Sequence, residues 1–259
     1  MKFNLLDHGY ASLIESWGSD RSIIEAARMS TNKGFLGWGE DPCPACNGTG
    51  WDPIPETTSD KECRYCKGQL KTVGDEKLLA YLYKNKHSTP FEMAGMTIEV
   101  KAPIFVFREW HRHRTQSYNE MSARYVPLPD ENYVPTVERL MSGANTATTN
   151  KQAQNNGKEL NNNAAIMWLE NLTMLYEHAE NVYQQGIELG IPKELARLAV
   201  PVARYSRMRA SANLRNWLAF LTLRRAPNAQ YEIRVYAEAV GKMIADRFPR
   251  TWELFNETV

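Results

Sequence analysis

Apolar residues recur at helical spacing in several stretches of the chain, and the longest of these covers residues 163–189. Its apolar side chains lie three or four positions apart, as one face of an amphipathic helix requires. They are Ile166, Leu169, Leu172, Leu175 and Tyr176. Gly190 predicts the end of this helix and Pro192 the start of the next. The same periodicity predicts helices from Asp20, which we expect to act as an N-cap, from near Asp75, and over residues 104–112, 213–225 and 230–247.

Strand-like patterns are shorter and are scattered between these helices. They cover residues 2–6, 96–100 and 202–210. Strands and helices do not alternate regularly, which favours an α+β fold over a parallel βαβ sheet. We therefore predict a mainly antiparallel sheet packed with long helices. The 259 residues suffice for a single domain over residues 1–259, with a small zinc-knuckle insertion at about 37–74.

The amino-acid composition limits the kinds of partner that we expect the protein to bind. The chain has 31 basic and 30 acidic residues and a net charge of +1, which argues against a general nucleic-acid or membrane-surface binder. No apolar run approaches the roughly 18 residues that a membrane-spanning helix needs. The first ten residues lack the long apolar core of a secretory signal. We expect a cytoplasmic protein.

The proposed insertion contains two C-x-x-C pairs. They are Cys43 with Cys46, and Cys63 with Cys66. Four thiolates in two such turns predict a closed tetrahedral zinc site, which leaves no coordination position for catalysis. The alternative is four free thiols in a loop. The C-x-x-C-x-G-x-G start resembles the zinc-binding repeats of DnaJ-type chaperones, and that resemblance implies a metal knuckle without chaperone activity.

Residues 108–125, REWHRHRTQSYNEMSARY, concentrate donors for an anionic ligand, because arginine guanidinium groups match phosphates and carboxylates. The plain alternative is an exposed basic helix end followed by a polar loop. The spacing R-H-R-x-x-S-x-N-E-x-S-x-R-Y, however, resembles the signature of the flavin-dependent thymidylate synthases. Two further segments support the resemblance: residues 26–30 are similar to the A-A-R-x-S segment of that family, and residues 87–92 to its H-x-T-P-F-E segment.

The resemblance implies roles for individual residues. Those expected to bind the flavin are Ser30, Thr89, Glu92, Arg112, His113, Arg114, Asn119, Glu120, Asn213 and Arg215. Those expected to bind the nucleotide are Glu120, Ser122, Ala123, Arg124, Arg197 and Arg224. Those expected to take part in catalysis are Arg224, Ser122 and His87. For three other arginines, Arg204, Arg207 and Arg209, we expect ion pairs with neighbouring carboxylates instead.

Some positions depart from the family pattern. Glu109 stands where some members have glutamine, and Ala219 and Asn228 stand where relatives have Asn and His. We therefore carry no role onto Glu109, and the flavin contacts near the other two positions stay open.

The resemblance implies an FAD-dependent reductive methylation of dUMP to dTMP. Methylenetetrahydrofolate would donate the carbon, NADPH the electrons, and homotetramers would share active sites between subunits. All four cysteines are committed to the expected Zn²⁺ site, so no protein thiolate is expected to attack the uracil ring. Two alternatives stay open: a related flavin-dependent pyrimidine nucleotide hydroxymethylase, and a non-enzymatic zinc-knuckle protein that binds nucleic acid. Neutral charge counts against the second.

Overall fold

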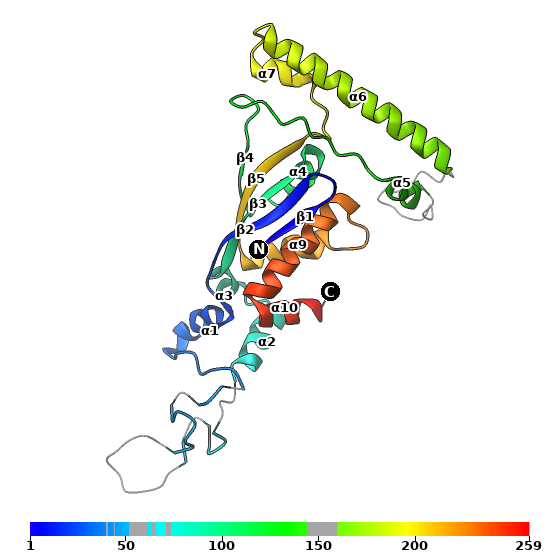
Figure 1. Ribbon diagram of the computed structural model, residues 1–259. Helices are drawn as coiled ribbons and strands as arrows, with labels where there is room; N and C mark the ends of the chain where they lie inside the picture. Colours follow the sequence, from blue (N-terminus) through cyan, green and yellow to red (C-terminus); the bar gives the residue numbers. More distant parts are fainter. Residues whose placement is uncertain are drawn as a thin grey trace. The chain divides into compact units, whose positions relative to one another are not determined.

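The computed structural model describes residues 1–39, 41–43, 45–51, 62–63, 66–70, 74–144 and 160–258. Its elements, in chain order (Figure 1), are β1 (Lys2–Leu5), β2 (Gly9–Trp17), α1 (Asp20–Arg28), η1 (Met29–Thr31), α2 (Glu76–Lys84), α3 (Ser88–Glu92), β3 (Gly95–Pro103), α4 (Ile104–Trp110), β4 (Ser117–Glu120), α5 (Val137–Ala144), α6 (Asn162–Glu188), α7 (Lys193–Ala196), η2 (Arg197–Ala199), β5 (Tyr205–Asn213), α8 (Leu214–Arg224), α9 (Tyr231–Arg247) and α10 (Pro249–Asn256). Parts of the predicted insertion lie outside the described residues.

The described strands form one five-stranded sheet in the order β1-β2-β3-β5-β4. β1 pairs antiparallel with β2, and β4 pairs antiparallel with β5. The edge strand β4 consists of signature residues, and its register sets Glu120 opposite Met208. The α+β prediction is confirmed. No helix among the described residues is long and apolar enough to cross a bilayer.

The chain divides into two compact units. The first comprises residues 1–15, 97–212 and 219–241, and the second comprises 16–96, 213–218 and 242–259. The first unit therefore contains most of the sheet and the arginine-rich signature, whereas the second contains both cysteine pairs. The assignment of one domain with an insertion stays a prediction.

The core of the first unit forms around aromatic side chains. Trp110 on α4 is fully buried and stacks on Phe220, with the ring centroids 4.7 Å apart. The Tyr236 hydroxyl on α9 donates to the carbonyl of Lys101 on β3 at 2.7 Å. A Cβ on Gly9 would lie 2.1 Å from that hydroxyl oxygen. Only glycine lets the start of β2 approach α9 this closely.

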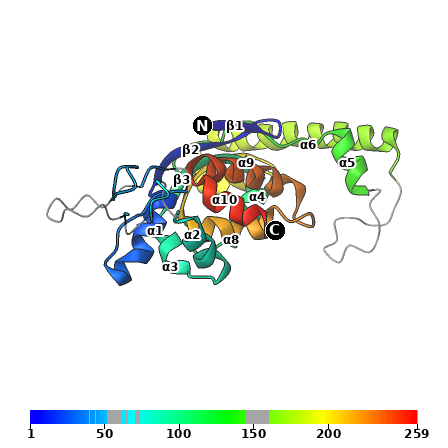
Figure 2. The same cartoon turned by 90° about the horizontal axis from the view of Figure 1, so that it is seen from below.

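The long helix α6 confirms the predicted helix over 163–189 to within one residue at each end. Gly190, with a φ of 76°, ends it as expected. Figure 1 shows the short α7 beside the C-terminal end of α6, and Figure 2 shows α5 beside the other end. Two residues of its predicted apolar face, Ile166 and Leu175, are 39% and 58% exposed.

In the second unit, the predicted cap of α1 is wrong by one residue. Ser19 is the N-cap, and its hydroxyl accepts from the Ser22 amide at 3.3 Å. Asp20 is buried and accepts from the amides of Arg250 and Thr251 and from the Thr251 hydroxyl. Burial raises the pKa of Asp20 although these donors oppose the shift. The carboxylate thus joins α1 to α10, a contact that the local sequence does not reveal.

Candidate active site

The first unit contains a cavity of about 480 Å³ beside the signature strand. Its polar lining consists of Arg108, His111, Glu120, Ser122, Arg197 and Ser206. Apolar side chains, including Ile104, Phe107 and Leu128, supply the rest of the wall. A few polar groups on an apolar wall are typical of a small-molecule site.

Strand β4 and the turn after it place the signature residues at this cavity. The backbone amide of Met121 donates to the Arg207 carbonyl at 2.8 Å, which continues the pairing with β5. The chain then turns: the Tyr125 amide donates to the Ser122 carbonyl at 3.0 Å, and the Arg124 amide to the Ser122 hydroxyl at 3.3 Å. Glu120, Ser122 and Ala123 therefore face one cavity, as the resemblance implies.

Two arginines from distant segments lie near this turn. Arg124 pairs with Glu194 on α7, with 3.0 Å between Nε and the carboxylate oxygen. Lys193 donates to the Tyr125 carbonyl at 3.0 Å, which holds α7 against the turn. Arg197 follows on η2, lines the cavity, and has no ion-pair partner among the described residues. Its guanidinium is thus available to an anion.

Arg224 lies in a separate cluster of the first unit and is not part of the cavity lining. Its Nε donates to His113 Nε2 at 2.9 Å, its Nη1 to the Glu109 carboxylate at 2.7 Å, and its Nη2 to the Glu109 carbonyl at 2.9 Å. Burial, aided by the Arg224 charge, lowers the pKa of His113 to about 4. The imidazole is therefore neutral near pH 7 and accepts a hydrogen bond at Nε2.

Three predicted flavin-binding residues of the signature are exposed: Arg112, Arg114 and Asn119. Neither Arg112 nor Arg114 has an ion-pair partner in the part of the chain that the structure describes. Their donors stay available to a large anionic cofactor, whereas His113 between them is engaged with Arg224.

The remaining predicted residues belong to the second unit. The Glu92 carboxylate accepts from Arg215 at 2.7 Å, which brings together two residues far apart in sequence. Asn213 accepts from the Asn216 amide at 3.0 Å at the start of α8. His87 immediately precedes α3, which contains Thr89, and its ring lies 5.6 Å from that of Tyr81. The Ser30 hydroxyl donates to the Ala27 carbonyl at 3.0 Å.

The cavity also includes residues to which the sequence assigned no role. Arg108 and His111 both line it from the end of α4. Their three-residue spacing in a predicted helix was the available signal, because such residues share a helix face. His111 Nε2 lies 3.2 Å from the sulfur of Met208, the residue that pairs with Glu120 in the sheet.

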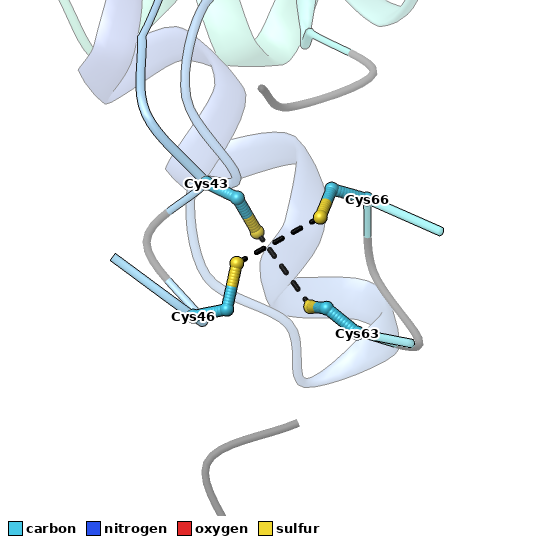
Figure 3. A group of neighbouring side chains, drawn as sticks. All are labelled: Cys43, Cys46, Cys63 and Cys66. Carbon is cyan, nitrogen blue, oxygen red and sulfur yellow. Dashed lines mark hydrogen bonds between the residues drawn. The ribbon is translucent and has the colours of Figure 1, made fainter. Parts of the chain in front are cut away.

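The four cysteines lie together in the second unit. Their side chains are buried and point toward a common centre (Figure 3). All four sulfur atoms lie within 4.8 Å of one another. The prediction that the two pairs form one cluster is confirmed.

Comparison with known proteins agrees with this geometry. Residues 12–250 match the family described as thymidylate synthase complementing protein. The chain belongs to this family. The matched range spans the signature and the cavity residues, so the resemblance found in the sequence is confirmed at the level of the thymidylate synthase complementing family.

Curated relatives of this family member are named flavin-dependent thymidylate synthase. The Thermus thermophilus protein is 35% identical over 254 residues, covering 98% of this chain and 77% of the relative. The Ruegeria pomeroyi protein is 34% identical over 257 residues, covering 98% and 72%. Among solved structures, a UMP/dUMP methylase, PolB from Streptomyces cacaoi bound with 5-Br UMP, has a TM-score of 0.72 at 29% identity, covering 98% of this chain and 96% of that one.

Proposed function

We propose that the protein is an FAD-dependent thymidylate synthase that converts dUMP to dTMP. Methylenetetrahydrofolate donates the carbon and NADPH the electrons. The observation that carries the proposal is the cavity at the end of β4, where Glu120, Ser122 and Arg197 meet. The family membership and the names of the relatives support the same activity.

The nucleotide phosphate fits the turn after β4. Arg197 lines the cavity wall without a carboxylate partner among the described residues, and its Nε donates to the Glu194 carbonyl at 3.3 Å. Arg124 pairs with the carboxylate of the same Glu194. Charge-assisted hydrogen bonds from arginine to phosphate are short, strong and often bidentate. We assign the phosphate to these two arginines with the hydroxyl of Ser122, and the nucleoside to the apolar wall.

The flavin fits the exposed signature residues. Arg112 and Arg114 offer guanidinium groups without carboxylate partners among the described residues, which suits the pyrophosphate of FAD. In the second unit, Thr89, Glu92, Asn213 and Arg215 are assigned to flavin binding from the family resemblance. Bound FAD, once reduced, supplies the hydride for the methyl group. The protein itself positions the reactants and stabilises developing charge.

We further propose a homotetramer in which active sites are shared. Arg224 lies outside the cavity lining of its own chain, which fits a role toward nucleotide bound by another copy. The segment from α6 to β5 also exposes large apolar side chains that a subunit interface would bury. They include Met167 (60%), Trp168 (49%), Leu175 (58%), Leu189 (72%), Leu198 (81%) and Val202 (63%).

Product analysis by mass tests the activity and its alternatives. The flavin-loaded protein is incubated with methylenetetrahydrofolate, NADPH and either dUMP or UMP. We expect dTMP from dUMP. A hydroxymethyl product would assign the related hydroxymethylase activity, and methylation of both UMP and dUMP would assign the activity named for the Streptomyces cacaoi protein. If flavin-loaded protein modified neither nucleotide, the proposed function would be wrong.

A further inference from the structure

We propose that Cys43, Cys46, Cys63 and Cys66 bind one structural Zn²⁺, which fastens the base of the insertion to α1 and α2. This site lies apart from the proposed chemistry and does not depend on it.

The sulfur positions already match a tetrahedral zinc shell. Cys43 Sγ lies 3.9 Å from Cys63 Sγ, and Cys46 Sγ lies 3.7 Å from Cys66 Sγ. Zinc–sulfur bonds of about 2.3 Å in a tetrahedron put sulfur atoms roughly 3.8 Å apart. A disulfide would need about 2.05 Å. The arrangement therefore fits four ligands around one ion and not two disulfides.

The backbone directly after each cysteine pair has the same conformation. Asn47 and Lys67, each directly after the second cysteine of its pair, both have a φ of 48°. The glycines that follow them are also left-handed, Gly48 at 76° and Gly68 at 74°. The turns pair reciprocally, since the Cys43 amide donates to the Leu70 carbonyl at 3.1 Å and the Cys63 amide to the Gly50 carbonyl at 2.7 Å. Turns that pair in this way bring the four cysteine sulfur atoms to one point, as a metal site requires.

Apolar packing does not account for this arrangement. The buried cluster consists of the four cysteines themselves, with only Ala45 packed against it among the described residues. Left-handed backbone at a residue such as Lys67 costs free energy and persists only where the surroundings impose it. A metal–thiolate shell supplies that constraint, because binding free energy at a structural zinc site is folding free energy.

The two ends of the insertion meet at one buried carboxylate. Asp75 is fully buried and accepts from Arg28 on α1 and from the Leu36 amide at 2.8 Å. The Asp75 amide in turn donates to the Gly37 carbonyl at 2.9 Å. The Gly39 amide donates to Glu76 on α2 at 2.7 Å. Zinc binding would shorten the flexible loop between the two ends of the insertion. The entropic cost of holding these ends together at Asp75 would then be smaller.

Metal content tests the site directly. The full chain, purified under reducing conditions, should contain about one zinc per chain. Replacing zinc with Co²⁺ should give the visible absorption of tetrahedral cobalt together with thiolate charge-transfer bands. Cys43→Ser should lose the metal, whereas the matched variant Cys43→His should retain it, because imidazole can replace a thiolate in a zinc shell. Metal-poor wild-type protein without the cobalt bands, or two disulfides by thiol counting, would overturn the proposal.

Hydrogen exchange tests the fastening without relying on a variant that folds. Removing zinc from the wild-type protein with a chelator should speed amide exchange at Leu36, Gly39 and Asp75 as well as at the cysteine turns, and adding zinc back should restore protection. If exchange rose only within the cysteine turns, zinc binding would stand and its role at the contacts of Asp75 would be wrong. Neither readout requires catalytic activity.

Discussion

At the scale of single residues, the arginines differ in whether a carboxylate of the described chain already pairs with them. Arg204 is fully buried between Asp130 and Glu180, and Arg209 pairs with Glu99. These two confirm the predicted ion pairs, whereas the described residues give Arg207 no carboxylate partner. Arg197 differs because it faces the cavity without a carboxylate partner among the described residues. The arginines of similar sequence context thus separate into those that pair with carboxylates of the described chain and those that we propose bind a ligand.

Arg197→Ala should weaken dUMP binding by about 1.5 to 3 kcal/mol, the cost of a lost charge-assisted hydrogen bond. This corresponds to a roughly ten- to hundredfold rise in Kd. Binding of deoxyuridine, which lacks the phosphate, should change little. Titration of the flavin absorbance with each ligand measures both values, and Arg209→Ala is the matched control. Equal losses for the nucleotide and the nucleoside would contradict the assignment to the phosphate.

The low pKa of His113 predicts an acid-sensitive contribution to stability. The unfolded imidazole has a pKa of about 6.5, and burial beside Arg224 lowers it to about 4 in the folded protein. Between these values the unfolded state binds more protons, so the free energy of unfolding falls as pH falls from about 6.5 to about 4. His113→Gln retains an acceptor for Arg224 but does not titrate.

Denaturant unfolding at pH 7 and pH 5 measures this contribution. The wild-type protein should lose more stability between the two pH values than His113→Gln does, because carboxylates titrate in both proteins and cancel. The same loss in both would show that His113 carries no such linkage.

At the scale of secondary structure, periodicity predicted most of the described helices, because it depends on local spacing. The predicted helix over 104–112 is α4 (Ile104–Trp110), and the one over 230–247 is α9 (Tyr231–Arg247). β4 was predicted as a loop, since its polar residues form a strand only by pairing with β5. β2, α3, α5 and α10 were also not predicted. α10 shows the reason, because the amides of Arg250 and Thr251 in its first turn donate to Asp20, which lies far away in sequence.

Gly9→Ala should destabilise the sheet where β2 meets α9. The new Cβ would approach the Tyr236 hydroxyl to 2.1 Å and the backbone carbonyls of Leu5 and Lys101 to 2.8 and 2.9 Å. Overpacking of this kind costs about 1 to 3 kcal/mol. Urea unfolding measures the loss. Gly34→Ala is the control, because nothing lies within 4 Å of its Cβ position, and an equal effect of both variants would rule out the proposed clash.

At the scale of the whole molecule, the site could be predicted only in part. Glu120, Ser122 and Ala123, which the signature string singled out, line one cavity, and their binding of the nucleotide stays a prediction. The contribution of Arg108 and His111 depends on how α4 packs beside β5, which the spacing alone does not determine. For Arg224, the sequence could not reveal that Glu109 and His113 use its three donor groups within the chain.

Leu175→Glu should dissociate the proposed tetramer and abolish activity at the shared sites. Leu175 is 58% exposed on α6, and an interface that buries it would have to desolvate the new carboxylate. Light scattering coupled to gel filtration measures the mass, and circular dichroism verifies the fold. Asn171→Glu, an exposed polar position on the same helix, is the control. An intact tetramer with Leu175→Glu would place the interface elsewhere.

The contacts of Asp75 also make the cysteine insertion a segment that can be replaced without changing the rest of the fold. A Cβ on Gly74 would lie 3.0 Å from the Gly39 amide nitrogen, so the two ends of the insertion lie next to each other. A turn of about two to four residues spans such a gap. The loop-closure free energy of a segment grafted between neighbouring ends grows only slowly with its length, by about 0.6 kcal/mol for each doubling. The host fold can therefore gain, lose or exchange this module while α1 and α2 keep their contact through Arg28 and Asp75.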